Sequence, residues 1–193
     1  MKKERKHIWI AGAILLTVLA ISWTLAFFTT NVDTENKIRF GRLDLKIHET
    51  TLDGAGEEVA YSPEEHPANI SKNNRQSRIV RVENTGRQPL YVRVNLGIAG
   101  EDRNGKKIEY ADALAKYTLN REDWLYQDGW YYYRDVLEPG SETKELMTEV
   151  IFDIEEIGSR YPGGKFDLDI SAQGVQSKNN ETDVLAVKGW PEE

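Results

Sequence analysis

The 193-residue chain contains no cysteine, and it has only two methionines, three histidines and six prolines. The lack of cysteine excludes disulfide bonds, thiol nucleophiles and thiolate metal sites. The fold must therefore be stabilised by the burial of side chains, without covalent cross-links.

The motifs of several common enzyme classes are also lacking. There is no G-x-S-x-G nucleophile motif and no Walker sequence, and Gly54-Ala55-Gly56 lacks the third glycine of a dinucleotide loop. His48 and His66 stand alone, without the H-E-x-x-H spacing of a zinc site, and are interpreted as surface or loop residues. Asp102-Arg103-Asn104-Gly105 lacks the alternating acids of a calcium loop and is interpreted as a turn. We therefore expect no catalytic residues, no metal site and no cofactor.

Positive charge is scarce outside the N-terminus. The chain has 25 Lys and Arg against 32 Asp and Glu, and its first 26 residues hold four of the basic residues but a single acid. The remaining 167 residues carry 21 basic and 31 acidic side chains, a net charge of about −10. Such a surface repels nucleic acid and anionic lipid headgroups, so we expect no nucleic-acid partner.

One long hydrophobic run, Ile8–Phe28, follows the basic head of the chain. This order is typical of an export signal, although 21 apolar residues are also enough to span a bilayer. Thr24 and Ala26 occupy the positions that a signal peptidase reads, which predicts cleavage before Phe27. Two interpretations stay open: residues 1–26 are a cleaved signal peptide, or the run is a retained membrane anchor to about residue 28. In both, residues 8–28 contact the membrane before any cleavage, and the rest lies outside the cytoplasm.

Alternating apolar and polar residues predict most of the remaining elements to be strands. The expected strands are Ile38–Ile47 with a bulge at Gly41, Arg78–Asn84, Leu90–Ile98, Leu146–Ile154 and Phe166–Ala172. Residues 49–77 are polar and rich in breakers, which predicts a long loop with short edge pieces. Helical spacing predicts a short helix over Tyr110–Leu119 and one or two helical turns over Asp183–Lys188.

A dense aromatic group surrounds a hairpin signal. Trp124–Tyr126 and Trp130–Val136 flank Asp128-Gly129, a dipeptide typical of a two-residue β-turn. One interpretation is core and cross-strand packing. The other is a contact surface for a subunit or a carbohydrate, formed by Trp124, Trp130, Tyr131 and Tyr133.

Short strands separated by turns, with almost no helix, predict an all-β protein. We expect a single β-sandwich domain over residues 27–193, with one or two short helices, preceded by the N-terminal signal or transmembrane helix. The immunoglobulin Cys–Trp–Cys signature is lacking. Jelly-roll-like and immunoglobulin-like topologies both remain open.

Five short motifs resemble those of a known family. They are Trp23–Phe28 with Asp33 close behind, Phe40–Leu45, Asn84-Thr85-Gly86 followed by Tyr91–Val94, Trp130–Tyr133 followed by Leu137–Thr143, and Ala172–Gln176. In this combination the chain resembles the TasA/camelysin (CalY) family of exported biofilm-matrix and surface-fibre proteins. The resemblance implies a jelly-roll-like sandwich, cleavage by a SipW-type signal peptidase, and assembly at the cell surface or in the extracellular matrix. The metallopeptidase label that camelysin brings to the family finds no supporting motif here.

These observations lead to one hypothesis and one rival. In the first, cleavage frees a segment from Phe27 to about Ile38 that adds as a strand to a neighbouring subunit, with Phe27, Phe28 and Val32 filling pockets. The protein would be a non-enzymatic matrix or fibre subunit, or an accessory of one, whose partners are the signal peptidase, itself or other matrix proteins. In the rival, the protein is a membrane-tethered monomer that binds a wall polymer or an exported partner.

Overall fold

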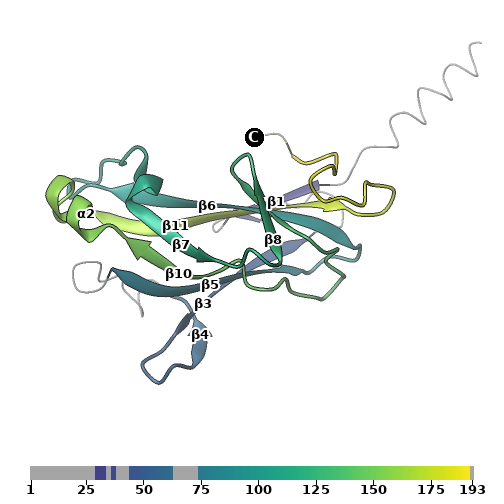
Figure 1. The fold of residues 1–193 in the computed structure, drawn as a ribbon, viewed down its shortest axis with the longest axis horizontal. Coiled ribbons are helices and arrows are strands. Elements are labelled where there is room, and N and C mark those ends of the chain that lie inside the picture. Colours follow the sequence, from purple (N-terminus) through teal and green to yellow (C-terminus); the bar gives the residue numbers. More distant parts are fainter. Residues whose placement is uncertain (1–28, 34–35, 38–43, 63–73, 192–193) are drawn as a thin grey trace, which may run out of the picture.

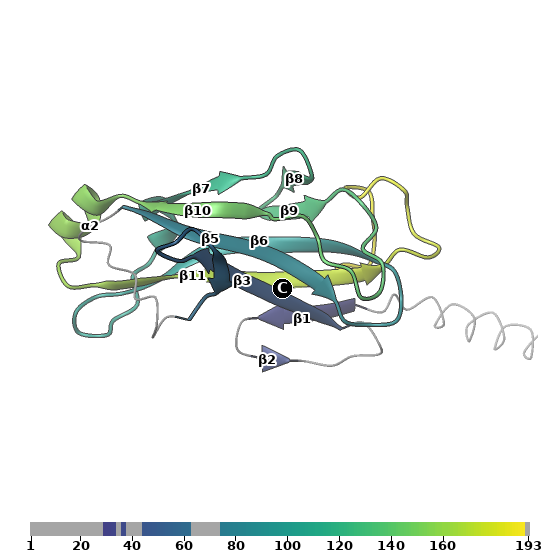
Figure 2. The ribbon, with the colours of Figure 1, turned by 90° about the horizontal axis from the view of Figure 1, so that it is seen from below.

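The computed structural model describes residues 29–33, 36–37, 44–62 and 74–191, with the backbone alone for the first two ranges. In this part of the chain, antiparallel strands form two sheets, and the protein is an all-β sandwich (Figures 1 and 2). Sheet A has the order β2 (Asn36–Lys37), β1 (Thr29–Asp33), β11 (Lys165–Gln176), β6 (Leu90–Glu101), β9 (Trp130–Tyr133), β8 (Trp124–Gln127). Sheet B has the order β4 (Glu58–Ala60), β3 (Leu45–Leu52), β5 (Arg75–Asn84), β10 (Met147–Phe152), β7 (Ala115–Leu119).

The longest pairing joins β6 and β11, which lie side by side over twelve residue pairs from Lys165↔Glu101 to Gln176↔Leu90. Both strands alternate as expected, so one face of each enters the core between the sheets. The core-facing residues that are less than 8% exposed include Leu90, Val92, Val94, Ile98, Phe166, Leu168, Ile170 and Ala172. The predicted strands here are confirmed, and each extends beyond its predicted end.

Two predicted turns have the backbone that their residues favour. Asp128 and Gly129 have φ values of 50° and 85° and join β8 to β9, as expected of an Asp-Gly hairpin. In Glu138-Pro139-Gly140, Gly140 has φ 74° and the amide of Ser141 donates to the carbonyl of Glu138, which fits a type II turn. Asp102–Gly105 is a turn as predicted, in which the Asp102 carboxylate accepts from the amides of Asn104 and Lys106.

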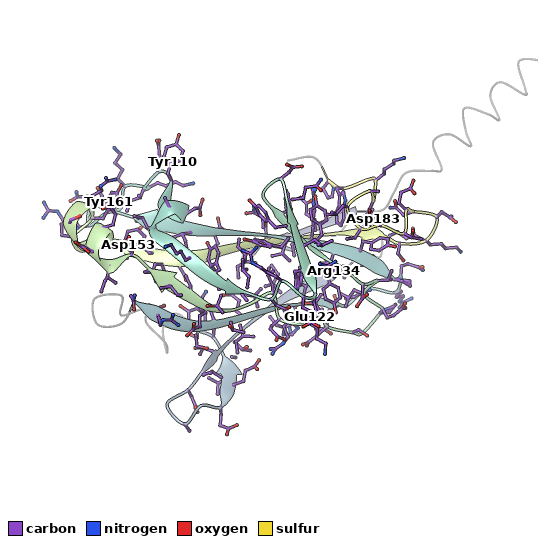
Figure 3. The ribbon with its side chains drawn as sticks, viewed as in Figure 1. Tyr110, Glu122, Arg134, Asp153, Tyr161 and Asp183 are labelled. Carbon is purple, nitrogen blue, oxygen red and sulfur yellow. The ribbon has the colours of Figure 1, made fainter. Side chains whose placement is uncertain are left out.

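The prediction of one helix over Tyr110–Leu119 was wrong in its second half. A 3₁₀ helix, η1 (Ala111–Leu114), is followed directly by β7. Tyr110 precedes η1 in the left-handed region (φ 60°) and is 85% exposed, so its ring does not belong to a buried helical face (Figure 3). Pairing of β7 with β10 outweighs the helical spacing of the sequence.

The prediction for Leu146–Ile154 was wrong at its end. The strand β10 stops at Phe152, and helix α2 (Ile154–Arg160) follows, with Ile154 42% exposed. Asp153 caps this helix by accepting from the amide of Glu156. The register shifts between Met147 and Glu149, so that Met147 and Val150 are both buried although they are three positions apart.

The expected long loop is shorter than predicted at both ends. Strand β3 continues to Leu52, β4 is one of the short edge pieces, and β5 begins at Arg75. In place of the helical turns predicted over Asp183–Lys188, residues 183–186 form a single turn, in which the amide of Ala186 donates to the carbonyl of Asp183.

Two predictions fall on other parts of the chain. The bulge at Gly41 and the apolar run Ile8–Phe28 lie outside the described residues. None of the helices within the described ranges is long and apolar enough to cross a membrane.

Candidate functional site

The predicted assembly strand lies beside β11 of its own chain. Strand β1 pairs antiparallel with β11 over five positions, from Thr29↔Val175 to Asp33↔Ser171. On its other side, β1 pairs with the two residues of β2. Val32 stands opposite Ala172 in this register, whereas Phe27 and Phe28 lie outside the described residues.

Strand β11 is much longer than β1. Beyond Ser171, residues 165–169 pair with β6 on one side, and no strand of the described ranges pairs with them on the other. Strand β1 therefore occupies only one half of this edge of β11, along residues 171–175. This place beside β11 is called here the β1 position. Main-chain hydrogen bonds of this kind depend little on the identity of the side chains, so any strand of matching length can form them.

An ionic cluster joins the two sheets next to the other half of β11. Arg78 of β5 is 3% exposed and faces the inside of the sandwich, as do Val80 and Val82 of the same strand. Its Nη2 lies 2.5 Å from Glu49 of β3, and its Nη1 lies 3.1 Å from Asp167 of β11. The guanidinium carbon also lies 3.4 Å from the centre of the Tyr61 ring.

At Glu49, burial and ion pairing shift the pKa of the carboxyl in opposite directions. Desolvation raises the pKa of its carboxyl above the ordinary value of 4.5, and the charge and hydrogen bond of Arg78 lower it by less. Desolvation likewise raises the pKa of Tyr61. The cluster therefore links β3 to β11 through Arg78, whose contact with Glu49 is largely buried, whereas the Asp167 side chain is 47% exposed.

The core is tightly packed directly beneath the β1 position. A Cβ atom on Gly174 would lie 3.1 Å from Cδ1 of Leu45 and 3.3 Å from Cδ1 of Leu90. Gly174 stands opposite Thr30 in the β1 pairing and opposite Val92 in the β6 pairing. The lack of a side chain lets β11 approach the leucines closely.

The aromatic hairpin is built into the sandwich, which does not fit the expected contact surface. Trp124, Trp130 and Tyr133 are 3%, 6% and 7% exposed, and Tyr131 packs against the core as a partly buried residue. Trp124 and Tyr133, which are cross-strand partners, have ring centroids 5.1 Å apart. The packing interpretation accounts for these four residues. Tyr126, 61% exposed, is the hairpin ring that reaches the surface, and it contacts Tyr131 with centroids 4.9 Å apart.

A second apolar cluster covers the outer face of sheet A. Residues 177–191, called here the C-terminal segment, place Val184 and Val187 against a set of strand residues: Tyr91, Trp130, Tyr132 and Val175. Figure 1 shows this segment in yellow beside the end of β11. Because the C-terminal segment covers this outer face, β6 and β11 are buried on both faces at this end of the molecule.

Arg93 lies within this second cluster, between two indole rings. Its guanidinium carbon is 4.2 Å from the centre of the Trp130 ring and 4.8 Å from that of Trp190. It also donates to Oε1 of Gln173 at 2.8 Å and to the carbonyl of Pro191 at 3.3 Å. The C-terminal segment is thus held by a cation between aromatic faces as well as by apolar burial.

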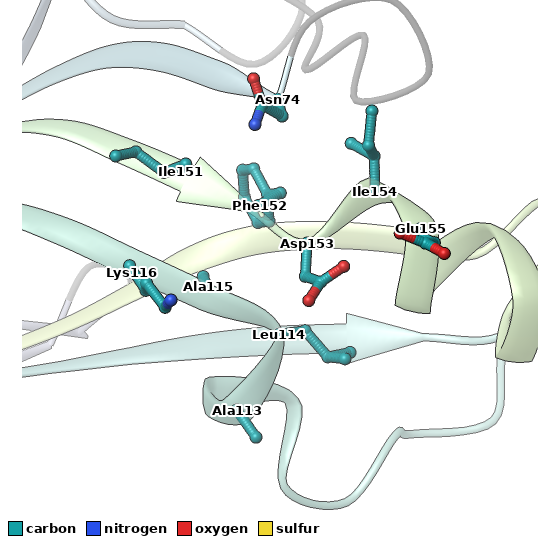
Figure 4. A pocket seen from close by; sticks show the side chains of 10 residues that line it. All are labelled: Asn74, Ala113, Leu114, Ala115, Lys116, Ile151, Phe152, Asp153, Ile154 and Glu155. Carbon is teal, nitrogen blue, oxygen red and sulfur yellow. The ribbon is translucent and has the colours of Figure 1, made fainter.

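A pocket of about 330 Å³ lies between η1 and β7 on one side and β10 and α2 on the other (Figure 4). Its polar lining residues include Asn74, Lys116 and Asp153. The Asp153 carboxylate already accepts from the amide of Glu156 as the cap of α2. No pairing of a nucleophile with a base occurs among the described residues that line this pocket.

One group of side chains could bind a metal ion. His48 of β3, Glu83 of β5 and Glu142 place their ligand atoms within 4.8 Å of one another. The sequence did not indicate this group, because Glu83 and Glu142 lie 35 and 94 positions after His48, and only the strand register joins them. His66, the other isolated histidine, lies outside the described residues.

Comparison with known proteins gives no relative for this chain. No protein-family model, no curated protein and no solved structure matches it significantly. The likeness to the TasA/camelysin family therefore rests on the sequence motifs, and it enters below as a proposal.

Proposed function

We propose that the chain is an exported, non-enzymatic structural protein of the TasA/camelysin type, which forms or assists a biofilm matrix or cell-surface fibre. A SipW-type signal peptidase would cut after Ala26, and the segment that begins at Phe27 would then pair with β11 of a neighbouring subunit. The single observation that carries this proposal is the position of β1: a five-residue strand, next to the edge strand β2, that is held by backbone pairing with β11 and β2.

Exchange of β1 between two copies of the chain costs little free energy. The β1–β11 pairing within one chain can be replaced by the same pairing from another chain, so the hydrogen bonds lost and gained are equivalent. Because each subunit would give its strand to the next and receive one from the previous, the contact is head-to-tail and produces an open filament. Phe27, Phe28 and Val32 remain the proposed side chains that fill pockets on the acceptor.

The topology supports the jelly-roll-like alternative for the sandwich. The last two strands are each inserted between earlier ones: β10 lies between β5 and β7 in sheet B, and β11 lies between β1 and β6 in sheet A. Consecutive strands β5, β6 and β7 alternate between the sheets. This arrangement supports a topology of two interleaved Greek keys, the pattern of a jelly roll.

The experiment that tests the assembly mechanism compares two deletions in the full chain, expressed in a host that has a SipW-type peptidase. Deletion of residues 27–37 removes β1 and β2, while the control deletion of residues 54–56 removes the exposed tip between β3 and β4. We expect pelletable polymers from the wild type and the control but none from the first deletion, with a thermal unfolding transition retained in all three. Polymers that persist without residues 27–37 would contradict strand addition.

Mass spectrometry of the same cultures tests export and distinguishes the proposal from the rival hypothesis of a membrane-tethered monomer. A species that starts at Phe27 outside the cells supports the proposal. Full-length protein confined to membranes would instead favour a tethered module that binds a wall polymer or an exported partner.

A further inference from the structure

Three potential metal ligands from separate segments meet on the outer face of sheet B. Nε2 of His48 lies 2.8 Å from Oε2 of Glu83 and 3.7 Å from Oε1 of Glu142. Their side chains are partly exposed, 27% for His48 and Glu83 and 46% for Glu142, so an ion can reach them from solvent.

The strand register brings His48 and Glu83 together. His48 stands opposite Arg81 in the β3–β5 pairing, and Glu83 follows two positions later on β5. Since Val80 and Val82 face the core, Arg81 and Glu83 face outward, and His48 shares their face. The two side chains are thus diagonal neighbours on one surface of the sheet, a spacing that long side chains bridge.

The backbone fixes Glu142 beside Glu83. These two residues form an antiparallel bridge, and the bonds on either side of it join Asn84 to Ser141 and Thr143 to Val82. Thr143 is 3% exposed, and its hydroxyl also accepts from the amide of Val82 at 3.0 Å. The main chain therefore fixes the backbone of Glu142 beside that of Glu83.

Two carboxylates that face each other across a β-bridge repel, and a cation between them offsets this cost. Arg81 is the nearby cation on β5, but its guanidinium is already engaged by the carboxylate of Glu58 through two hydrogen bonds. Lys46 stands opposite Glu83 in the register, and it is exposed. A positive ion bound to His48 would attract the carboxylates of Glu83 and Glu142 at the same time, and so offset their repulsion.

We propose that His48, Glu83 and Glu142 bind one divalent transition-metal ion of the Zn²⁺ class. An imidazole nitrogen with two carboxylate oxygens matches the ligand preference of Zn²⁺, with metal–ligand distances of about 2.0–2.2 Å. Ligands at those distances around a tetrahedral ion are about 3.3–3.6 Å apart, between the 2.8 Å and 3.7 Å that separate His48 from the two carboxylates. Ca²⁺ and Mg²⁺ prefer oxygen ligands alone and fit this set less well.

The ion would have a structural role in the folded chain. It would connect β3, β5 and the segment around Glu142, and so stabilise the native state by binding it and not the unfolded chain. Three protein ligands leave a fourth position open for water or for a ligand from another molecule. The proposal does not depend on export or on strand addition.

The test measures Zn²⁺ binding to the full chain, purified in detergent without a histidine tag, by competition with a chromophoric chelator. Four proteins are compared: the wild type, His48→Ala, Glu142→Gln and the matched control His66→Ala. We expect one Zn²⁺ per chain in the wild type and in the control, and at least tenfold weaker binding in the other two variants. Zn²⁺ should also raise the unfolding temperature of the wild type but not that of His48→Ala.

Two outcomes would overturn the proposal. One is binding in His48→Ala or Glu142→Gln as tight as in the wild type. The other is displacement of Zn²⁺ by an equal concentration of Ca²⁺ or Mg²⁺, which would indicate an unselective acidic surface. Glu142→Gln keeps the shape of the side chain and the His48–Glu83 contact, so a loss of binding there is not explained by loss of the fold. The absorption spectrum of the Co²⁺-loaded wild type, compared with that of Glu142→Gln, provides a second readout of the coordination.

Discussion

The Glu49 carboxylate lies 2.5 Å from Nη2 of Arg78 in the space between the two sheets. The Arg78 side chain is 3% exposed and that of Glu49 is 15% exposed, so both charges are largely removed from water. Loss of either partner from such a pair leaves the other charge buried without compensation. This relationship makes the fold sensitive to the loss of either Arg78 or Glu49.

Arg78→Ala is expected to lower the free energy of unfolding by about 3 kcal/mol, because it leaves the Glu49 carboxylate buried and unpaired. The matched control is Arg75→Ala on the same strand. Arg75 is 57% exposed and pairs with Glu149, an exposed pair whose loss is expected to cost less than about 1 kcal/mol. Urea unfolding of the two variants measures the difference. Equal losses would contradict the assignment of Arg78 to the buried cluster.

The raised pKa of Glu49 predicts a pH dependence of stability that is opposite to that of most acidic residues. Its folded-state pKa lies above the ordinary value of 4.5, so the folded protein binds this proton more readily than the unfolded chain. Stability due to this group is therefore lost as the pH rises from about 4.5 through the folded-state pKa. We expect the wild type to gain stability relative to Glu49→Gln as the pH is lowered through that window. A loss of wild-type stability relative to Glu49→Gln as the pH is lowered would refute the direction of the shift.

Gly174→Ala is expected to destabilise the protein by about 1 kcal/mol, since the added methyl group would press on Leu45 and Leu90. The control is Gly158→Ala in α2, where a Cβ atom would meet nothing within 4 Å. That change is expected to be neutral or stabilising by up to about 1 kcal/mol, because alanine favours a helix over glycine. Thermal unfolding of both variants gives the comparison. A gain in stability for Gly174→Ala would show that the leucines move aside freely.

Val187→Asp is expected to release the C-terminal segment from sheet A. Val187 is 6% exposed within the second cluster, and a carboxylate buried among these apolar side chains loses its hydration. Trp130 would then become accessible, so tryptophan emission should shift to longer wavelength and residues 177–191 should become sensitive to protease. Ala186→Asp introduces the same charge at the exposed neighbouring position and should leave both signals unchanged. Identical behaviour of the two variants would argue against a docked segment.

The sheet elements could be predicted from sequence where one face of a strand is buried and the other is not. Leu90–Ile98 and Phe166–Ala172 alternate for this reason, and the structure confirms both. The same rule failed at Ile154, which continues the alternation of Leu146–Ile154 but lies in α2. The capping signal was present there, with Asp153 as N-cap and Glu155 and Glu156 in the first turn. The two signals compete in a short segment, and here the cap and the helix outweigh the alternation.

The candidate metal site could not be predicted in this way. His48 looks isolated in the sequence because its neighbours on the sheet come from β5 and from the segment after the Gly140 turn. Their convergence depends on the register of β3 against β5 and on the Glu83–Glu142 bridge, which no local pattern specifies. The buried partners of Trp130 were missed for a related reason: the polar C-terminal segment contributes its few apolar residues to the outer face of sheet A.

The twelve-residue pairing of β11 with β6 has a mechanical consequence for any assembly that is joined through the edge of β11. Tension along such a filament would act parallel to these two strands, so their hydrogen bonds would be sheared together and not opened one after another. A pair that is long, antiparallel and covered on both faces at one end resists that kind of load well. Under pulling, rupture is therefore expected first at the short junction with β1, and the subunit itself should remain intact.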